Sequence, residues 1–453
     1  MKKQLDRRDF LKHSITGAVS ASPLIAMLGS LSQLEAAQTD GEYKAIVCVL
    51  LEGGADVFNM VAPLQKDAYN GYKAVRQELA LPKESLLPIT DTYGLRANMA
   101  NMQKLFEDQK LAVIANVGTL VKPTTLKEIE EGSAILPSQL FAHNTQRDLW
   151  MLGSAREALR NGWAARLGDT FYAAPNPYFN VTVAGNNLMQ LGGKAEAMAF
   201  DDAYISPDTM RYYGFGPESG GGDVGNVYQD MYEAKQSDGN KLLAAFAKRR
   251  VEKLKQQETL GGALFEGVQE FDAFNTGVHE TGKSLGKQLE IVAKILSVKE
   301  NFPGQRKRQI FFVNHHGWDT HDSDNEHQAG YLSESLGAFQ DALEKMGIAD
   351  SVTTFTISDF GRSLSPNGAG TDHGWGAHAF VMGGAVKGGN IYGTMPQLIP
   401  NSPDAWIDRM IPTTAMESYL AMIVKWFGAT ESELDTIFPN LKSFTVKDMG
   451  FIG

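Results

Sequence analysis

The sequence predicts an α/β fold: a mostly parallel, doubly wound sheet flanked by helices, with a helical or irregular insertion. Four short apolar runs each end at polar turn residues, as expected for strands that are buried on both faces of a parallel sheet. Patterns with three- and four-residue apolar spacing lie between these runs and indicate helices. The composition, 43% hydrophobic and 21% charged, is that of a soluble globular protein.

The four predicted strands lie at 44–51 (KAIVCVLL), 111–117 (LAVIANV), 308–314 (RQIFFVN) and 352–358 (VTTFTIS). The first contains Cys48, the single cysteine of the chain. A lone cysteine excludes an internal disulfide, and its place inside an apolar run predicts a buried small side chain, not a nucleophile.

The predicted helices separate these strands or follow them, at 98–109, 284–299, 326–346 and 413–428. The last, TTAMESYLAMIVKWFG, ends at Gly428, a residue type that commonly terminates helices. Strands that alternate with helices favour right-handed crossover connections and one sheet with helices on both faces.

The N-terminus resembles an export signal. A basic head with Arg7 and Arg8 precedes a mostly apolar stretch from Ile15 to Leu31, and small residues follow at Ala36 and Ala37. The string DRRDFLK resembles a twin-arginine (Tat) signal, which implies the Tat export machinery as a partner. We therefore expect residues 1–37 to be a cleaved signal and the mature protein to be periplasmic or secreted. The apolar stretch contains Ser20, Ser22 and Pro23 and is short, so we expect no stable membrane span after cleavage; an uncleaved anchor is the alternative.

We expect residues 38–453 to form a single α/β domain with an insertion at about 185–283. The insertion contains a glycine-rich stretch at 214–225 and a charged helical region at about 226–260. Its Lys/Arg run is interpreted as a solvated helix face. The net charge of −11 argues against a nucleic-acid partner, but a bound dication would still let a small anionic substrate approach.

Six of the nine histidines fall between residues 315 and 378, among aspartates in glycine-broken loops. Turn chemistry favours Asp, Gly and Asn but does not require histidine, so this pattern indicates a metal site. Open α/β sheets bind ligands at the carboxyl ends of their strands. If the strands are parallel, the candidate ligands converge at one edge of the sheet: Asp56, Asp319, His321, Asp359, Asp372, His373 and His378.

Several motifs make the chain resemble the Tat-exported family catalogued as domain of unknown function 1501, which is related to the alkaline phosphatase and sulfatase superfamily. The motifs are GGADVFNMVAP (53–63), LFAHNTQRDLW (140–150), GWDTH (317–321), SDFGR (358–362), GTDHGWG (370–376), KWFG (425–428) and FPNL (438–441). The resemblance covers nearly all of the predicted mature chain. It implies an alkaline phosphatase-like or sulfatase-like fold.

The resemblance implies one or two divalent metal ions, with Zn, Mn, Mg and Ca as candidates. In that superfamily an Asp after the first strand, an Asp and a His after a later one, and an Asp-His pair commonly hold two ions. Carried over, this implies Asp56, then Asp319 with His321, then Asp372 with His373. Asp359 follows its strand directly, where the superfamily usually has its Asp-His pair, so Asp359, Asp372 or both are candidates. His378 is a candidate late histidine.

Substrate-binding candidates are Arg362, whose planar guanidinium suits an anionic group, together with Asn59 and His316. Arg362 pairing with a nearby Asp and Asn59 capping a turn are equally good interpretations. The nucleophile is open. Superfamily members use a Ser, Thr or modified Cys near a helix start, and here Thr119, Thr124, Thr125 and Thr145 are candidates, with direct attack by water as the alternative. His143 is a candidate ligand, proton donor or orienting group.

These observations favour an exported metal-dependent hydrolase of a small anionic or polymer-borne phosphate or sulfate ester. Two alternatives stay open. The protein is a non-catalytic exported metal-binding protein that binds an extracellular polymer or partner, or the Asp/His set braces loops around one ion such as Ca²⁺.

Overall fold

The structure is a computed structural model. It describes residues 42–453 except 157, 173–175, 200–229, 268, 270, 276–284, 303–306 and 446–447. The predicted signal at 1–37 and the glycine-rich stretch at 214–225 therefore lie outside the described residues.

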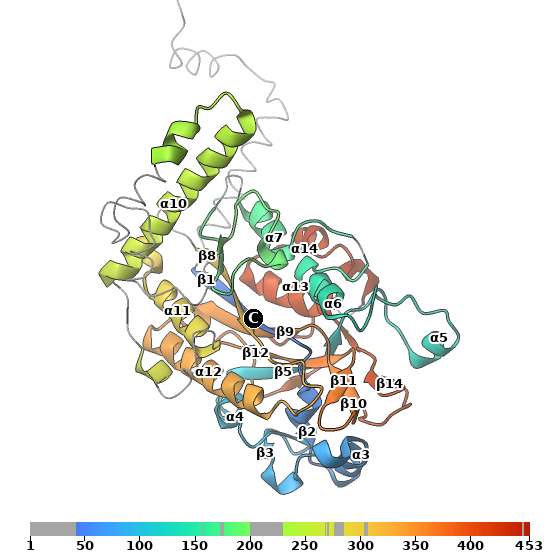
Figure 1. Ribbon diagram of the computed structural model, residues 1–453. Coiled ribbons are helices and arrows are strands. Elements are labelled where there is room, and N and C mark those ends of the chain that lie inside the picture. The colour runs from blue at the N-terminus through green and yellow to red at the C-terminus, as the bar shows by residue number, and fades with distance from the viewer. Residues whose placement is uncertain are drawn as a thin grey trace, which may run out of the picture. The chain divides into compact units, whose positions relative to one another are not determined.

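The described part of the chain is built on a nine-stranded sheet with the order β13-β5-β12-β9-β1-β8-β6-β7, and β16 also pairs with β5 (Figure 1). Neighbouring strands run parallel except at β12, which is antiparallel to both β5 and β9. The strands of this sheet are β1 (Lys44–Leu51), β5 (Leu111–Gly118), β6 (Asn180–Thr182), β7 (Met198–Ala199), β8 (Arg308–His315), β9 (Val352–Ser358), β12 (Ala377–Met382), β13 (Ile391–Tyr392) and β16 (Thr414–Ala415).

All four predicted strands are confirmed as β1, β5, β8 and β9. The parallel register aligns Leu51 at the end of β1 with His315 of β8 and with Ser358 of β9. The carboxyl ends of these three strands therefore meet at one edge of the sheet, as the α/β prediction requires.

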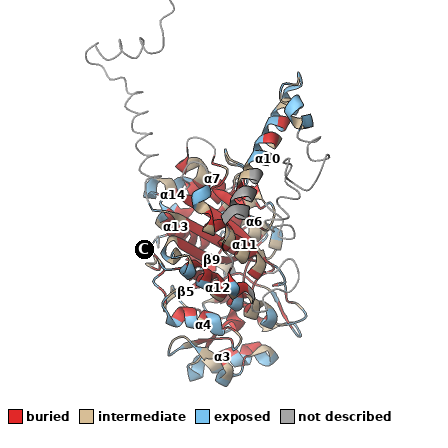
Figure 2. Ribbon diagram, turned by 90° about the vertical axis from the view of Figure 1, so that its left-hand side faces the viewer, coloured by how far each residue is buried: buried red, intermediate tan, exposed pale blue. Residues whose placement is uncertain are grey.

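Helices cover both faces of the sheet (Figures 1 and 2). One apolar cluster contains Val47 and Val49 of β1, and the other contains Ile46 and Cys48, because successive strand residues point to opposite faces. The first cluster is covered by α4 (Ala100–Glu107), α11 (Leu285–Ser297) and α12 (Glu326–Lys345). The second is covered by α6 (His143–Leu152), α7 (Trp163–Phe171), α13 (Met416–Phe427) and α14 (Glu431–Ile437).

The helices predicted at 98–109, 284–299, 326–346 and 413–428 are confirmed as α4, α11, α12 and α13, and Gly428 caps α13. Cys48 is fully buried, as predicted. The expected helical region of the insertion contains α10 (Lys241–Gly267). No helix in the described ranges is long and apolar enough to cross a membrane.

Small elements complete the fold near the carboxyl edge of the sheet. They are β2 (Val61–Pro63), β3 (Leu87–Pro88), β4 (Tyr93–Leu95), α3 (Lys66–Arg76), α5 (Leu126–Glu130), β10 (Arg362–Pro366), β11 (Thr371–His373), β14 (Ala405–Trp406) and β15 (Arg409–Met410). Four of these strands form two short antiparallel hairpins, β10 with β11 and β14 with β15.

Candidate metal centre

Three imidazoles and one carboxylate converge beyond the carboxyl ends of β8 and β9. Nε2 of His373 lies 3.0 Å from Nε2 of His143 and 3.0 Å from Nε2 of His321. Oδ1 of Asp319 lies 3.0 Å from Nε2 of His321, 3.4 Å from that of His373 and 3.5 Å from that of His143. Ligand atoms of His143, Asp319 and His373 thus form one close group, and Nε2 of His321 flanks it beside Asp319 and His373.

The other ring nitrogen of each histidine faces an acceptor. Nδ1 of His373 lies 2.8 Å from the carbonyl oxygen of Phe141, and Nδ1 of His143 lies 2.8 Å from Oδ2 of Asp359. Nδ1 of His321 lies 3.4 Å from Oδ1 of Asp372. A carbonyl oxygen cannot donate, so His373 carries its proton on Nδ1, and an ionised Asp359 places the proton of His143 on Nδ1 too.

These two tautomers leave lone pairs on the Nε2 atoms of His143 and His373, which face each other and Asp319. Lone pairs at such distances repel unless a cation or protons lie between them. Ligand atoms around a tetrahedral Zn²⁺ with bonds of about 2.0–2.1 Å lie about 3.3 Å apart. The contacts among Nε2 of His143, Nε2 of His373 and Oδ1 of Asp319, at 3.0–3.5 Å, match that spacing, and ligand atoms of these three residues all lie within 4.8 Å of one another. The donor set therefore fits a metal ion.

Three separate segments supply these side chains. His143 is the first residue of α6, whose N-cap is Ala142. Asp319 and His321 lie in the loop after β8, and His373 ends β11, where it pairs with Arg362 of β10. Gly53 lets the loop after β1 approach Asp319: a Cβ at Gly53 would lie 2.3 Å from the backbone nitrogen of Asp319, and its φ is +121°.

Arg362 fixes the carboxylate of Asp319. Its guanidinium is fully buried and donates to Oδ1 of Asp319 at 2.8 Å, to the Gly53 carbonyl at 3.3 Å and to both the hydroxyl and the carbonyl of Thr371. Burial alone would raise the pKa of Asp319, but the hydrogen bond from Arg362 and the nearby cationic groups hold it below the ordinary value. The structure thus places Arg362 where it pairs with an aspartate, one of the two roles that the sequence allowed.

Burial lowers the pKa of His373 and the charge of Arg362 adds to this effect, although the hydrogen bond to Phe141 O and the carboxylate of Asp319 oppose it. A histidine with a lowered pKa keeps its neutral, ligating form to lower pH.

Asp359 lies directly behind His143. Its carboxylate is buried, accepts a hydrogen bond from Gly53 N at 3.2 Å and orients the imidazole of His143. Asp372 is exposed, lies 3.4 Å from Nδ1 of His321 and accepts from Asn367 at 2.6 Å, and the same Asn367 amide lies 3.4 Å from that nitrogen. Neither Asp359 nor Asp372 joins the ligand group, and Asp359 takes the place of a carboxylate that fixes a histidine tautomer in metal sites.

The structure does not bring Asp56 into this cluster. Its carboxylate forms a buried ion pair with Arg76 of α3. Asn59 belongs to the same network, because its side-chain oxygen accepts from Tyr72 and from Arg76 and its amide donates to Leu79 O. The strand-end rule places Asp56 at the right edge, but the direction of its side chain is set by the guanidinium in α3.

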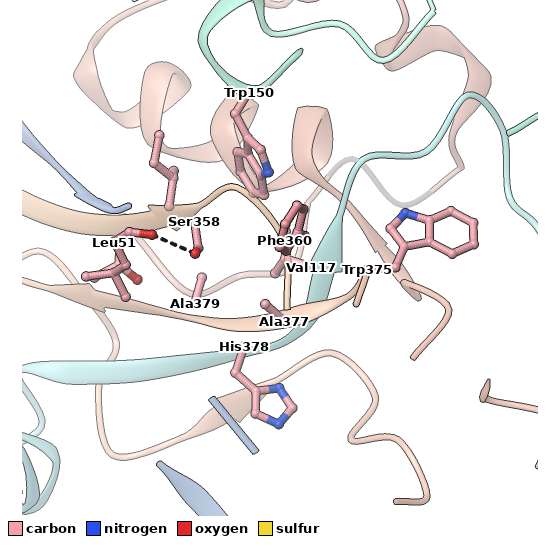
Figure 3. Close-up of a pocket in the computed structure, with 11 residues that line it drawn as sticks. Leu51, Val117, Trp150, Ser358, Phe360, Trp375, Ala377, His378 and Ala379 are labelled. Carbon is pink, nitrogen blue, oxygen red and sulfur yellow. Dashed lines mark hydrogen bonds between the residues drawn. The ribbon is translucent and has the colours of Figure 1, made fainter. Parts of the chain in front are cut away.

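His378 lies away from the cluster as well. Its Nδ1 accepts from the backbone nitrogen of Asn116 at 3.1 Å, its ring packs edge-on against Phe58, and burial lowers its pKa to about 3. Figure 3 shows its ring on the opposite side of β12 from Ala377 and Ala379, as strand alternation requires.

The proposed hydroxyl nucleophiles also lie elsewhere. The hydroxyl of Thr119 donates to Gln146 Oε1 at 2.6 Å, and that of Thr145 donates to Gln139 Oε1 at 2.5 Å. The hydroxyl of Thr124 donates to Lys122 O, and Thr125 caps α5. His316 is exposed and pairs through Nδ1 with Glu52 Oε2 at 2.6 Å.

Sequence reasoning missed three polar residues beside the cluster. Glu52, the residue after β1, pairs with Arg147, and Nε of Arg147 lies 3.8 Å from Oδ1 of Asp359. Arg147 is four residues after His143 in the motif LFAHNTQRDLW, so helical spacing could have placed both on one face of α6. The third, Arg409, donates through Nε to the His373 carbonyl at 3.0 Å, and no motif marked it.

Comparisons with known proteins give a family model of unknown function and solved structures of low similarity, and they leave the activity unassigned. The family model "Protein of unknown function (DUF1501)" matches residues 304–405, which contain Asp319, His321 and His373. No curated protein sequence matches the chain.

Solved structures that resemble the chain include the PsFucS1 sulfatase from Pseudoalteromonas sp., with 10% identity, a TM-score of 0.34 and coverage of 93% of this chain and 77% of that one. Another is the lipoteichoic acid synthase LtaP from Listeria monocytogenes, with 10% identity, a TM-score of 0.29 and coverage of 79% and 68%. An alkaline phosphatase, PafA, matches with 10% identity, a TM-score of 0.31 and coverage of 71% and 64%.

Proposed function

We propose that the protein is an exported metal-dependent hydrolase of a phosphate or sulfate ester. The observation that carries this proposal is the approach of the Nε2 atoms of His143 and His373 to each other and to Oδ1 of Asp319, with each of these two histidines held by an acceptor on Nδ1. Export is proposed from the basic head and apolar stretch of residues 1–37, and it places the active protein in the periplasm or outside the cell.

The donor set favours a transition metal. Imidazole nitrogens with a carboxylate oxygen suit Zn²⁺, Mn²⁺ or Fe²⁺, whereas Ca²⁺ and Mg²⁺ prefer oxygen ligands. This composition speaks against a loop-bracing Ca²⁺. His143, Asp319 and His373 form a candidate site for one ion, with His321 beside it, and Zn²⁺ is the ion we propose.

A bound dication would polarise an ester oxygen and lower the pKa of water next to it. The protein's own residues keep the site ready for that chemistry. Arg362 fixes Asp319, and Asp359 holds His143 through the proton on Nδ1. The side chain of Asp319 is 47% exposed and that of His373 is 25% exposed, so a substrate can reach the centre from solvent.

We propose water as the nucleophile. The hydroxyls of Thr119, Thr124 and Thr145 donate to acceptors outside the cluster, and Thr125 caps α5. Moving any of them to an ester at the centre would break these contacts.

A second candidate function is binding without catalysis. In it the protein keeps the metal and uses it to bind an extracellular polymer or partner. The engagement of all four candidate threonines elsewhere in the fold favours this alternative, because it removes the covalent nucleophile that the superfamily resemblance implies.

The test is turnover of a panel of aryl phosphates, phosphodiesters and sulfates by the full-length protein supplied with Zn²⁺ or Mn²⁺. We expect hydrolysis of at least one class, lost in Asp319→Asn and in His373→Ala. His327→Ala is the matched control, because His327 is an exposed histidine of α12. Bound metal without turnover of any ester would favour the binding function, and equal rates in the wild type and His373→Ala would refute a role for this centre.

A further inference from the structure

Phe141 and Arg409 lie next to His373. The Phe141 ring lies 6.0 Å from the Trp406 ring at 33°, and the Arg409 guanidinium lies 5.1 Å from the centroid of Phe141. Phe141 and Arg409 also contact the backbone and side chain of His373 directly, since Phe141 O accepts from Nδ1 and Arg409 Nε donates to the carbonyl. We call Phe141, Trp406 and Arg409 the aromatic rim. All three are partly exposed.

Trp406 and Arg409 face each other across the β14–β15 hairpin. The tip of this hairpin is strained: Ile407 has φ +62°, a conformation that β-branched residues rarely adopt, and it is 55% exposed. Its carbonyl accepts from Asn401 N at 2.7 Å, and Asn401 itself has φ +57°. Backbone strain of this kind persists only where the surrounding structure holds the residue in place, and it is frequent at ligand-binding sites.

A cavity of about 500 Å³ lies between α5 and the segments that flank β14 and β15. Figure 1 shows α5, β14 and the β10–β11 hairpin at one end of the domain. α5 contacts β14, and β15 contacts β10, which pairs with the strand that ends at His373. The cavity and the metal centre are thus connected through one hairpin. Its volume is in the range of ligand-binding clefts.

The cavity lining mixes hydrogen-bonding groups with apolar surface. Glu130, Asn401 and Thr413 contribute a carboxylate, an amide and a hydroxyl, and these side chains form no hydrogen bond or ion pair within the described ranges. Leu126, Ile411 and Pro412 supply apolar surface. The lining thus offers hydrogen-bond donors, hydrogen-bond acceptors and apolar surface, and no single charge dominates it. A polyhydroxylated ring presents hydroxyl groups and C–H surface that match such a lining.

We propose that this cavity binds a sugar ring of a polymeric substrate, and that the aromatic rim carries the chain from the cavity to the metal centre. The aromatic faces of Trp406 and Phe141 suit the C–H face of a sugar ring. Nη2 of Arg409 makes no hydrogen bond within the described residues, while Nη1 is held by Asp408 at 2.6 Å. It is free to hold an anionic substituent of the same polymer. This inference rests on the proposed hydrolase and names its substrate class: an ester carried by a glycan.

The experiment measures binding and turnover separately. The full-length wild type is applied to an array of oligosaccharides from bacterial, algal and plant wall polymers, beside arrays of peptides and of membrane lipids. Thr413→Trp fills the cavity from an exposed position, and Asn401→Gly removes the amide while keeping the positive φ. Ser133→Trp, an exposed position after α5 that does not line the cavity, is the matched control.

We expect the wild type and Ser133→Trp to bind the same oligosaccharides, and both cavity variants to bind them at least tenfold more weakly. On a small aryl ester the cavity variants should keep the wild-type rate, whereas KM for the ester-bearing glycan should rise. Wild-type binding to no glycan, or to peptides or lipids alone, would overturn the proposal, as would unchanged glycan binding in both cavity variants. Glycan binding without turnover of any ester would defeat the hydrolase and leave this binding site standing.

Discussion

Nδ1 of His143 lies 2.8 Å from Oδ2 of the buried Asp359, which makes the aspartate the group that sets the tautomer of this histidine. The same carboxylate accepts from Gly53 N, so it joins α6 to the loop after β1. Its other oxygen has no hydrogen-bond partner among the described residues and has only Arg147 at 3.8 Å. Asp359 is therefore the residue that orients His143, and no other residue in the described part of the chain takes over this role.

Replacing this aspartate should weaken metal binding without removing a ligand. In Asp359→Asn an amide can turn its NH₂ toward Nδ1 and move the histidine proton to Nε2. We expect the affinity for Zn²⁺ to fall by about 10–100-fold. Competition with a chromophoric chelator measures this change, and the more exposed Asp372→Asn should show a smaller one. Equal affinity in Asp359→Asn and the wild type would remove the orienting role.

Asp56→Ala should affect stability and leave the metal in place. The carboxylate of Asp56 forms a buried ion pair with Arg76, and removing one partner of such a pair costs about 3–5 kcal/mol. Urea unfolding gives the change in free energy of unfolding, and elemental analysis of the folded variant gives its metal content. Loss of the metal at unchanged stability would instead make Asp56 a ligand.

Gly53→Ala should disturb the centre through the backbone. A methyl group there would lie 2.3 Å from Asp319 N, and the φ of +121° disfavours any side chain. We expect a lower midpoint of thermal unfolding and weaker metal binding, because the loop with Asp319 must shift. Gly132→Ala is the control for positive φ alone, since a Cβ at Gly132 meets nothing within 4 Å. Similar metal affinities in the two variants would contradict the proposed steric role of Gly53.

Glu417 should make the protein less stable as the pH rises. This carboxyl in α13 is fully buried, and burial raises its pKa from 4.5 to about 7, although hydrogen bonds from Asn440 and Ala155 N oppose the shift. Between these two pKa values the folded state holds a proton that the unfolded state has lost. Stability should therefore fall as the pH rises from about 4.5 to about 7, by up to about 3 kcal/mol, and stay lower above that range.

Glu417→Gln removes the titration and keeps an oxygen that can accept both hydrogen bonds. Thermal unfolding at pH 5 and pH 8 should show the variant more stable than the wild type at pH 8, with little difference at pH 5. The same difference at both pH values would show that Glu417 does not titrate in this way.

The sequence predicted the sheet better than the site. Apolar runs located β1, β5, β8 and β9 almost to the residue, because buried parallel strands carry near-continuous apolar sequence. The antiparallel β12 was not predicted. The β12 sequence AHAFVM follows a glycine-rich loop. The direction in which this strand enters the sheet depends on how far that loop extends, and no local sequence pattern encodes that length.

The strand-end rule located the edge of the sheet but not the direction of each side chain. Asp319, His321 and His373 point to a common region, whereas Asp56 turns to Arg76 and His378 is placed on the far side of β12 by strand alternation. Asp359 follows its strand directly, yet it lies behind His143 because α6 brings that histidine over the strand end. The directions of these side chains are set by contacts between segments that are far apart in the sequence. The periodicity of a single segment holds no information about such contacts.

The central claim is a metal ion held by His143, Asp319 and His373, and the metal content of the purified full-length protein tests it most directly. After reconstitution with Zn²⁺ and removal of free metal, we predict one equivalent per chain in the wild type and in His327→Ala, and loss of that ion in His373→Ala. A wild type that retains no ion, or a His373→Ala variant with the same content as the wild type, would contradict the account.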